Sequence, residues 1–358
     1  MSLFFFDGFD FTNGNEYGPG GRLWDQGSSA SDQAGRWGGG AISPSGSGNL
    51  FIGEFGGLFK KFTSRAGVVL GVAARFDSFT AEFGTLAQPF IFFGDLQSTG
   101  ETIQCSLWVD PNTFAITLRT GRGDQITDTT LATTNYIPPL TLWFYLEIKL
   151  TIGNPGSVEI RIDGTDVVLA TGIQTQQSPN PTWNVIHLSA MDAFGPTWVA
   201  DDFYLVDPND GQGSTDFLGE VRVQTHFPDA DGYQNNFLRS TGSINATNVA
   251  QAVSYTDDGL YNYSGNVNDI DLYSITPFAI TGQVFGVQEN MSVRKDNTGS
   301  RSVCPLMRIG ATNFQGPSFI CFSSFTYMGD IWEYNPLTSA PWVLADLNST
   351  QFGIQITA

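Results

Sequence analysis

The chain has 358 residues, enough for two domains that each bury a core, and its formal net charge is −19. This acidity argues against nucleic acid and against anionic membrane surfaces as partners, because both require clustered Lys and Arg side chains. No stretch reaches the length of a transmembrane helix, and the apolar start MSLFFFDGFDF lacks the basic residues of a signal peptide. The 13% aromatic content, with 41 Gly and 17 Pro, predicts short strands and tight turns.

Short apolar or alternating runs, separated by turn residues, fill the first part of the chain. Such an arrangement predicts an all-β sandwich, because an antiparallel sheet must cover its apolar face and no helical pattern lies nearby. The predicted strands are 3–11, 49–52, 67–76, 89–93, 103–109, 113–120, 146–152, 158–163, 165–170, 183–190 and 198–205.

Residues 208–214, PNDGQGS, are polar and rich in glycine, so we place the domain boundary there. The predicted domains are 1–207 and 212–358. The strands predicted in the second domain are 217–223, 277–294, 302–309 and 318–334. The pattern TSAPWVLADLN predicts a short helix within 338–350, and we expect it to be the longest in the chain.

The central hairpin, WFYLEIKLTIGNPGSVEIRIDG, has the clearest alternation in the sequence. Alternation with period two places one set of side chains in a core and the other in water. The predicted core residues are Leu146, Ile148, Leu150, Val158, Ile160 and Ile162. The predicted solvent-facing residues are Glu147, Lys149, Glu159 and Arg161. Opposite charges favour the register that places Lys149 opposite Glu159 and Glu147 opposite Arg161.

Few residues could assemble a catalytic group. The chain has two histidines; His187 alternates with Ile186 and Leu188, which predicts that it faces solvent or a neighbouring protomer. Glu159 and Asp163 are about 13 Å apart on one strand, too far for a hydrolytic carboxylate pair. We therefore expect no catalytic residues and no enzyme.

Three acidic residues, Asp7, Asp10 and Asp202, are candidate calcium ligands. If the first and last strands of the sandwich pair, Asp7 or Asp10 lies near Asp202, and carboxylates with backbone carbonyls suit Ca²⁺. The alternative is that these side chains cap turns and accept hydrogen bonds from backbone amides, and no other cofactor is expected. The cysteines Cys105, Cys304 and Cys321 show no metal-binding spacing and are predicted to be buried thiols. A disulfide between Cys304 and Cys321 is the alternative.

Several segments resemble a group of tailed-bacteriophage structural proteins. They are MSLFFFDGFDF at the start, GRWGGGAI at 35–42, WFYLEIKL and SVEIRIDGTDV in the middle, ADDFYLVD at 200–207, STDFLGEVRVQTHFPDADG at 214–232 and NPLTSAPWVLADLNSTQFGIQI at 335–356. The resemblance implies a concanavalin A-like (laminin G-like) jelly roll in the first domain and a second β-rich domain. It also implies a non-enzymatic protein on the virion, in a capsid decoration, neck, tail or fibre, with other virion proteins and copies of itself as partners.

Aromatic residues leave a second function open. Exposed aromatic rings could stack on sugars or anchor protein interfaces, although most are expected to lie in a core. The candidates are Trp183, Trp198, Tyr204, Trp332 and Tyr334. The leading hypothesis is a structural virion protein that acts through protein–protein interfaces. The alternative is a carbohydrate-binding adhesin that attaches the particle to host-surface glycans.

Overall fold

The computed structural model describes residues 2–9, 24–28, 50–52, 57–78, 88–110, 113–122, 128–136, 138–189, 197–211, 213–250, 259–279 and 281–358. These residues form mainly antiparallel strands and divide into two compact units, with the division along the chain at Gln224 and Thr225. That division lies later than the expected 208–214 boundary. No helix among the described residues is long and apolar enough to cross a membrane.

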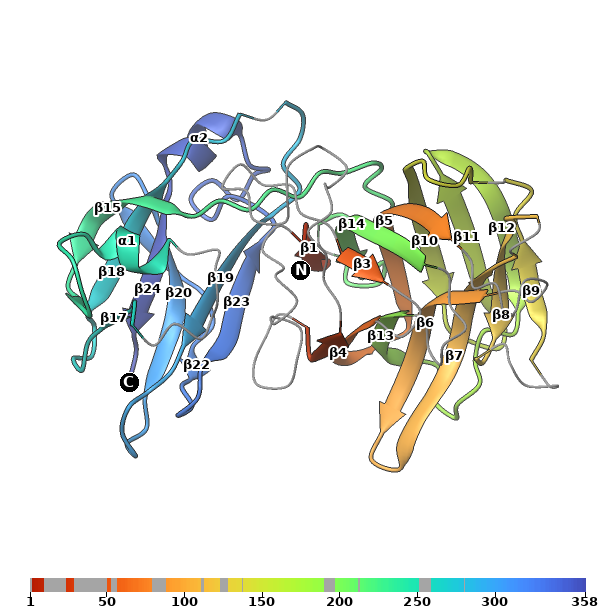
Figure 1. Cartoon of the computed structure of the whole chain (residues 1–358), viewed down its shortest axis with the longest axis horizontal. Coiled ribbons are helices and arrows are strands. Elements are labelled where there is room, and N and C mark those ends of the chain that lie inside the picture. The colour runs from red at the N-terminus through yellow and green to blue at the C-terminus, as the bar shows by residue number, and fades with distance from the viewer. Residues whose placement is uncertain are drawn as a thin grey trace. The chain divides into compact units, whose positions relative to one another are not determined.

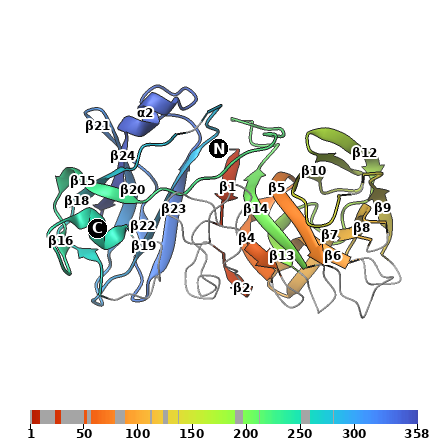
Figure 2. The same cartoon turned by 45° about the horizontal axis from the view of Figure 1, so that its top comes forward.

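The first unit is a jelly-roll sandwich of two sheets, and the two layers are visible in Figures 1 and 2. The first sheet has the order β1 (Leu3–Asp7), β14 (Thr197–Val206), β5 (Gly67–Ser78), β10 (Phe144–Thr151), β11 (Gly156–Ile162) and β12 (Thr165–Ile173), with β3 (Leu50–Ile52) also paired to β14. The second sheet has the order β2 (Gln26–Ser28), β4 (Gly57–Arg65), β13 (Trp183–Ser189), β6 (Gln88–Gln97), β7 (Gly100–Val109), β8 (Ile116–Thr120) and β9 (Thr130–Thr133).

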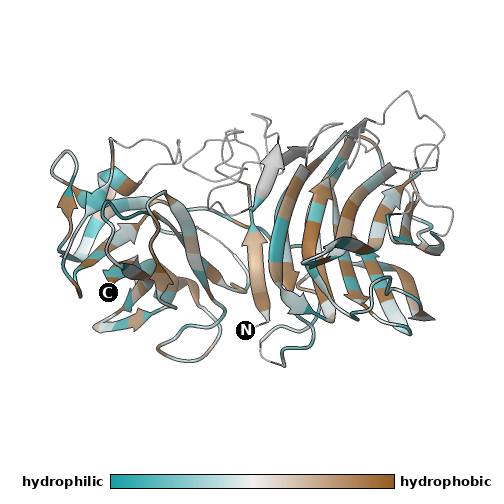
Figure 3. Cartoon of the chain, turned by 90° about the horizontal axis from the view of Figure 1, so that it is seen from below, coloured by the Kyte–Doolittle hydropathy of each residue, from teal (hydrophilic) through white to brown (hydrophobic). Residues whose placement is uncertain are grey.

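Large aromatic side chains join the two sheets. The ring centres of Phe76 on β5 and Phe90 on β6 are 5.3 Å apart, and those of Phe90 and Trp198 on β14 are 5.6 Å apart. The indole nitrogen of Trp183 on β13 donates to the carbonyl of Gly67 on β5 at 3.1 Å. Hydrophobic and hydrophilic bands alternate along many strands (Figure 3), as expected for sheets with one face in the core.

The central hairpin has the predicted register. Lys149 lies opposite Glu159 and Glu147 opposite Arg161. The six predicted core side chains are all buried, which confirms which face of the hairpin lies in the core. The prediction for Glu147 was wrong, because its side chain is only 1% exposed.

Glu147 is buried because residues 216–223, which we call the strap, cover it. Residues 217–223 of the strap were predicted as a strand but form no ladder. Its amides instead bind side chains of the first sheet: Gly219 N–H donates to Glu147 Oε1 at 2.9 Å and Val223 N–H to Asp202 Oδ1 at 2.7 Å. The outer face of this sheet is therefore partly covered by the chain itself.

The second unit is also β-rich. Its main sheet has the order β15 (Pro228–Asn235), β18 (Ile270–Ile275), β24 (Gln351–Ile356), β20 (Ser302–Ile309) and β21 (Thr312–Gln315), and β22 (Phe319–Ile320) also pairs with β20. The remaining pairs are β19 (Val287–Val293) with β23 (Thr326–Trp332) and β16 (Leu238–Arg239) with β17 (Asn262–Tyr263). Among the described residues of this unit the helices are α1 (Asn245–Val249) and α2 (Leu344–Ser349); α2 is the longer and begins within the predicted range.

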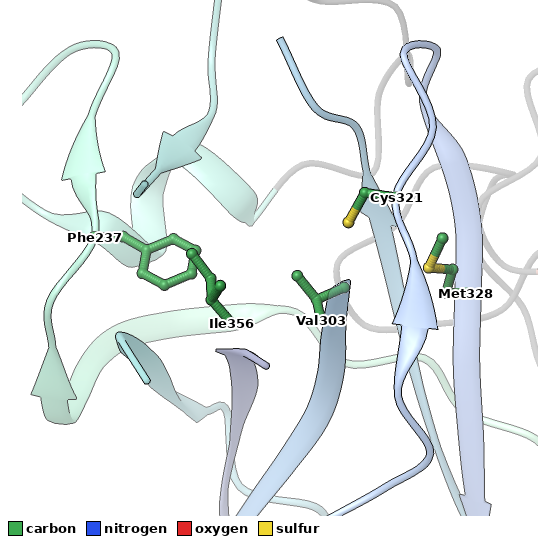
Figure 4. Close-up of a cluster of buried hydrophobic side chains, with 5 residues drawn as sticks. All are labelled: Phe237, Val303, Cys321, Met328 and Ile356. Carbon is green, nitrogen blue, oxygen red and sulfur yellow. The ribbon is translucent and has the colours of Figure 1, made fainter. Parts of the chain in front are cut away.

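Apolar side chains pack the β19–β23 pair against β20 and β24. Figure 4 shows one such cluster, made by Phe237, Val303, Cys321, Met328 and Ile356. All three cysteines are buried and unpaired, so the prediction of buried thiols is confirmed and a disulfide between Cys304 and Cys321 does not form.

Candidate functional site

A row of side chains crosses the outer face of the second sheet of the first unit. His187 on β13 lies opposite Phe59 on β4 and opposite Phe92 on β6, Phe92 lies opposite Ser106 on β7, and Ser106 lies opposite Arg119 on β8. The neighbours of these residues along each strand, such as Leu188, point into the core, so the row lies on the opposite side of the sheet. On that side Phe92 and Ser106 are buried, while Phe59, His187 and Arg119 are partly exposed. We call Phe59, His187, Phe92, Ser106 and Arg119 the outer-face row.

An acid–imidazole pair lies at one end of the row. The Nε2 atom of His187 is 2.7 Å from Oε1 of Glu101, which reaches over from the start of β7. Gly94 lies beneath this contact: a Cβ atom there would be 2.1 Å from Glu101 Oε1 and 2.6 Å from Val185 Cγ1. The missing side chain at Gly94 is therefore what lets the carboxylate reach the imidazole.

Aromatic rings enclose the imidazole. The centre of the His187 ring lies 5.0 Å from that of Phe59 and 6.3 Å from that of Phe92. The ammonium of Lys61 lies 5.2 Å from the centre of the Phe59 ring. Lys61 is exposed, whereas the His187 side chain is only 13% exposed because the two rings and Glu101 cover most of it. This end combines apolar ring surface with an acid, an imidazole and an ammonium.

The other end of the row is more enclosed. The Trp108 indole N–H donates to Ser106 Oγ at 2.8 Å, and Ser106 Oγ in turn donates to the Gly121 carbonyl at 2.8 Å. The Arg119 guanidinium lies 4.8 Å from the Trp108 ring centre. Partial burial lowers the pKa of Arg119, and the nearby carboxylates of Asp110 and Asp128 partly offset this. The chain thus keeps a cation over an indole ring on this face.

A loop is fixed beside this sheet by two polar side chains. Gln104 accepts hydrogen bonds from the amides of Gln177 and Ser178 at 2.6 and 3.0 Å, and its own amide donates to the Thr182 carbonyl at 2.7 Å. Asp95 accepts from the Ser178 hydroxyl at 2.6 Å. These hydrogen bonds anchor residues 177–182 to β6 and β7 at the border of the outer face.

The predicted calcium ligands have other partners. Asp7 Oδ1 accepts from the Phe9 amide and Asp7 Oδ2 from the Trp24 indole, both at 2.8 Å, while Asp202 accepts from the strap. Asp10 lies outside the described residues, so a calcium site at these three positions stays a prediction. Within the part of the chain that the structure describes, no three His, Cys, Asp or Glu side chains are grouped to hold a metal ion.

The predicted aromatic candidates do not form an exposed platform. Trp183, Trp198 and Tyr204 are buried within the first unit, where Tyr204 donates to Glu147 Oε1 at 2.5 Å. In the second unit, Trp332 is half-buried against the core and Tyr334 is 40% exposed. Sequence reasoning missed Phe59, Phe92 and Trp108. From a strand pattern alone, an aromatic residue is assigned to the core, even when it lies on the outer face of the sheet. The pairing of Glu101 with His187 gave no sequence signal, because these residues are far apart in the chain.

No protein-family model and no curated protein matches the chain. Among solved structures, it is similar to domain 4 of AbnA, a GH43 extracellular arabinanase from Geobacillus stearothermophilus in complex with arabinotriose, with a TM-score of 0.38, 14% identity and coverage of 57% of this chain and 92% of that one. It is also similar to an endo-β-1,4-glucuronan lyase from the fungus Trichoderma reesei, with a TM-score of 0.34, 10% identity and coverage of 44% and 75%.

A third similar structure is the Trypanosoma rangeli sialidase in complex with the inhibitor DANA, with a TM-score of 0.33, 16% identity and coverage of 45% of this chain but only 25% of the sialidase. These similarities concern the sheet architecture. The expectation that the chain is not an enzyme is corrected here, because a lyase and a sialidase are among the structures similar to it.

Proposed function

We propose that the first unit binds carbohydrate on the outer face of its second sheet. The observation that carries the proposal is the outer-face row, in which His187 lies between two phenylalanine rings and contacts Glu101 at 2.7 Å. An outer sheet face normally carries polar side chains, whereas here the partly exposed Phe59 ring provides flat apolar surface beside fixed polar groups. Sites for small ligands combine these two kinds of group.

The chemistry of the row suits a sugar. The C–H faces of a pyranose can pack on the Phe59 ring, while hydroxyl groups can exchange hydrogen bonds with Glu101 and Lys61. If His187 donates from Nε2 to Glu101, its Nδ1 is an acceptor in the neutral imidazole. Donors and acceptors held beside an aromatic ring orient a polyhydroxylated ligand without a metal.

Binding can be tested on purified full-length protein with a glycan array, followed by calorimetry on the glycans that bind. Phe59→Ser removes the ring and His187→Ala removes the imidazole, so each is expected to weaken binding at least tenfold, or about 1.4 kcal/mol. Gly94→Val displaces Glu101 and is expected to weaken binding as well. Leu169→Ser is the matched control, because Leu169 is 74% exposed on the other sheet of the same unit.

An array without any bound glycan would contradict the proposal. So would glycan binding that is unchanged in both Phe59→Ser and His187→Ala while both variants remain folded. Loss of binding in Leu169→Ser would place the site on the other sheet.

The place of this unit in a virion belongs to the same proposal. The sequence resemblance to tailed-phage structural proteins supports a particle-borne protein, and a carbohydrate-binding face on a particle would serve attachment to host-surface glycans. Contacts with other virion proteins and with copies of the chain would then hold it on the particle. Antibody labelling of intact particles against the outer-face row tests this, and labelling that appears only after particle disruption would contradict a role in attachment.

A further inference from the structure

Two tyrosine rings lie next to each other on the β16–β17 pair of the second unit. Leu238 lies opposite Tyr263 and Arg239 opposite Asn262 in this pair. The Tyr261 and Tyr263 rings are 5.9 Å apart at an interplanar angle of 56°. Tyr261 is 37% exposed, Tyr263 48% and Leu238 61%, so these side chains present apolar surface to solvent.

A buried polar network fixes the direction of these rings. Asn262, between the tyrosines, donates to Asp271 Oδ2, to the Tyr273 hydroxyl and to the Asn245 carbonyl, each at 3.0 Å. Successive side chains of a strand point to opposite faces. Because Asn262 is held inward by these bonds, Tyr261 and Tyr263 are held outward.

The network itself is firmly anchored. Asp271 has no exposed surface and accepts from Asn245 Nδ2 at 2.7 and 2.8 Å as well as from the Tyr273 hydroxyl at 2.5 Å. Directly after β16, the Ser240 amide donates to the Tyr261 carbonyl at 2.9 Å, and the Tyr261 amide donates to Ser240 Oγ at 3.0 Å. Because these bonds already fix the two tyrosine rings, the rings would lose little conformational entropy on binding a ligand.

The size and charge of this surface decide which ligand it fits. A standard protein–protein interface uses roughly 20–30 residues on each side, whereas the described residues that carry this surface are two tyrosines with Leu238 and Ser240 beside them. Nucleic acid is disfavoured by the net charge of −19. Two adjacent aromatic rings flanked by hydroxyl groups fit the apolar faces of neighbouring sugar units in a short saccharide.

We propose that Tyr261 and Tyr263 form a second carbohydrate-binding site, in the second unit, for neutral oligosaccharide chains. We call it the tyrosine platform. It is separate from the outer-face row and does not depend on it. Its rings supply stacking surface, and its hydroxyls supply hydrogen bonds at the edge of the sugar.

The test uses the full-length chain carrying Phe59→Ser, so that binding at the outer-face row is already impaired. Cellohexaose, maltohexaose and chitohexaose are the probes, and saturation-transfer NMR with calorimetry is the measurement. At least one hexasaccharide is expected to bind, and the added double substitution Tyr261→Ser with Tyr263→Ser is expected to weaken that binding at least tenfold. Tyr261→Phe with Tyr263→Phe keeps the rings and is expected to retain most of the binding.

Tyr233→Ser is the matched control, because Tyr233 is another exposed tyrosine of this unit, 72% exposed, and its ring contacts Arg308 instead. It is expected to leave binding unchanged. Failure of all three hexasaccharides to bind the Phe59→Ser protein would overturn the proposal, as would equal binding after the double serine substitution. Self-association that the double substitution abolishes would also overturn it, in favour of a contact between copies. None of these outcomes depends on whether the wild-type outer-face row binds glycan.

Discussion

Several carboxyl groups in this acidic chain are buried, and burial raises their pKa. Desolvation raises the pKa of Glu289 well above its usual value, and it raises that of Glu147 and Asp271 despite several hydrogen bonds to each. Burial raises the pKa of Asp7 from 3.8 to about 6, although hydrogen bonds from Trp24 and Phe9 act to lower it. These groups favour the folded state most when they are protonated.

Asp7 gives a pH-dependent stability with a defined sign. Since its pKa is higher in the folded state, the folded protein binds the proton more tightly, and the free energy of unfolding falls as pH rises from about 4 to about 6. The pKa difference of about 2 corresponds to roughly 3 kcal/mol. Asp7→Asn is expected to remove this part of the pH dependence. Urea unfolding of both proteins between about pH 3.5 and about pH 7 measures the difference.

Asp216→Asn provides a control of the opposite sign. Hydrogen bonding to the Phe217 amide and the ion pair with Lys149 lower the pKa of Asp216, so its small contribution is lost as pH falls. An Asp7→Asn protein with the same pH dependence as the wild type would show that Asp7 titrates alike in the folded and unfolded states.

Strands of the first unit use glycine to let a long side chain cross a sheet face. A Cβ at Gly71 on β5 would lie 2.0 Å from the Tyr204 ring, and Tyr204 uses that space to reach Glu147. Gly94 on β6 does the same for Glu101 and His187. A glycine in a strand costs backbone entropy, but at these positions it permits a polar contact that another residue would block.

Gly71→Ala is therefore expected to lower the free energy of unfolding by about 1–3 kcal/mol, because the new methyl group overlaps the Tyr204 ring. In a Tyr204→Ala background the same substitution is expected to cost little, since the ring is gone. Gly265→Ala is the control, because a Cβ there has no atom within 4 Å. Equal costs of Gly71→Ala in both backgrounds, measured by denaturant unfolding, would show that strain in the backbone and not the ring is responsible.

At the scale of the whole molecule, the chain folds as two units. The boundary between them lies where residue contacts divide, at 224–225, and not at the Gly-rich segment 208–214. The Gly-rich residues 208–214 look like a linker, but the strap that follows them belongs to the first unit. The Leu218 amide donates to the Tyr204 hydroxyl at 3.0 Å, and the Arg161 guanidinium lies 4.1 Å from the Phe217 ring centre. The first unit is therefore complete only when the strap is included.

A fragment of residues 1–224 is expected to be more stable than one of residues 1–207. Removing the strap deletes its amide donors and leaves the buried carboxylate of Glu147 with fewer partners. Net hydrogen-bond contributions of about 1 kcal/mol and unsatisfied-group costs of about 1–3 kcal/mol predict a loss of about 2–5 kcal/mol. Chemical unfolding of the two fragments measures this difference, and identical unfolding curves would place the strap outside the first unit.

The central hairpin shows how far the sequence alone could lead. Alternation between 146 and 162 predicted which side chains enter the core, and the charges of Lys149 and Glu159 predicted the register. Local pattern was sufficient there because both strands and their turn are continuous in the chain. The outer-face row could not be predicted in the same way, because its members come from β4, β13, β6, β7 and β8, and their pairing is set by sheet order.

The sequence by itself determined the all-β class, the core face of the central hairpin and the buried state of the three thiols, because apolar periodicity and burial preference are local properties of the chain. Only the tertiary structure decided what covers the other face of each sheet. Glu147 follows the pattern of a solvent-facing residue, yet the strap, about 70 residues away, buries it. Alternation fixes the side to which a residue points, but the partner it meets there comes from a distant segment brought close by folding.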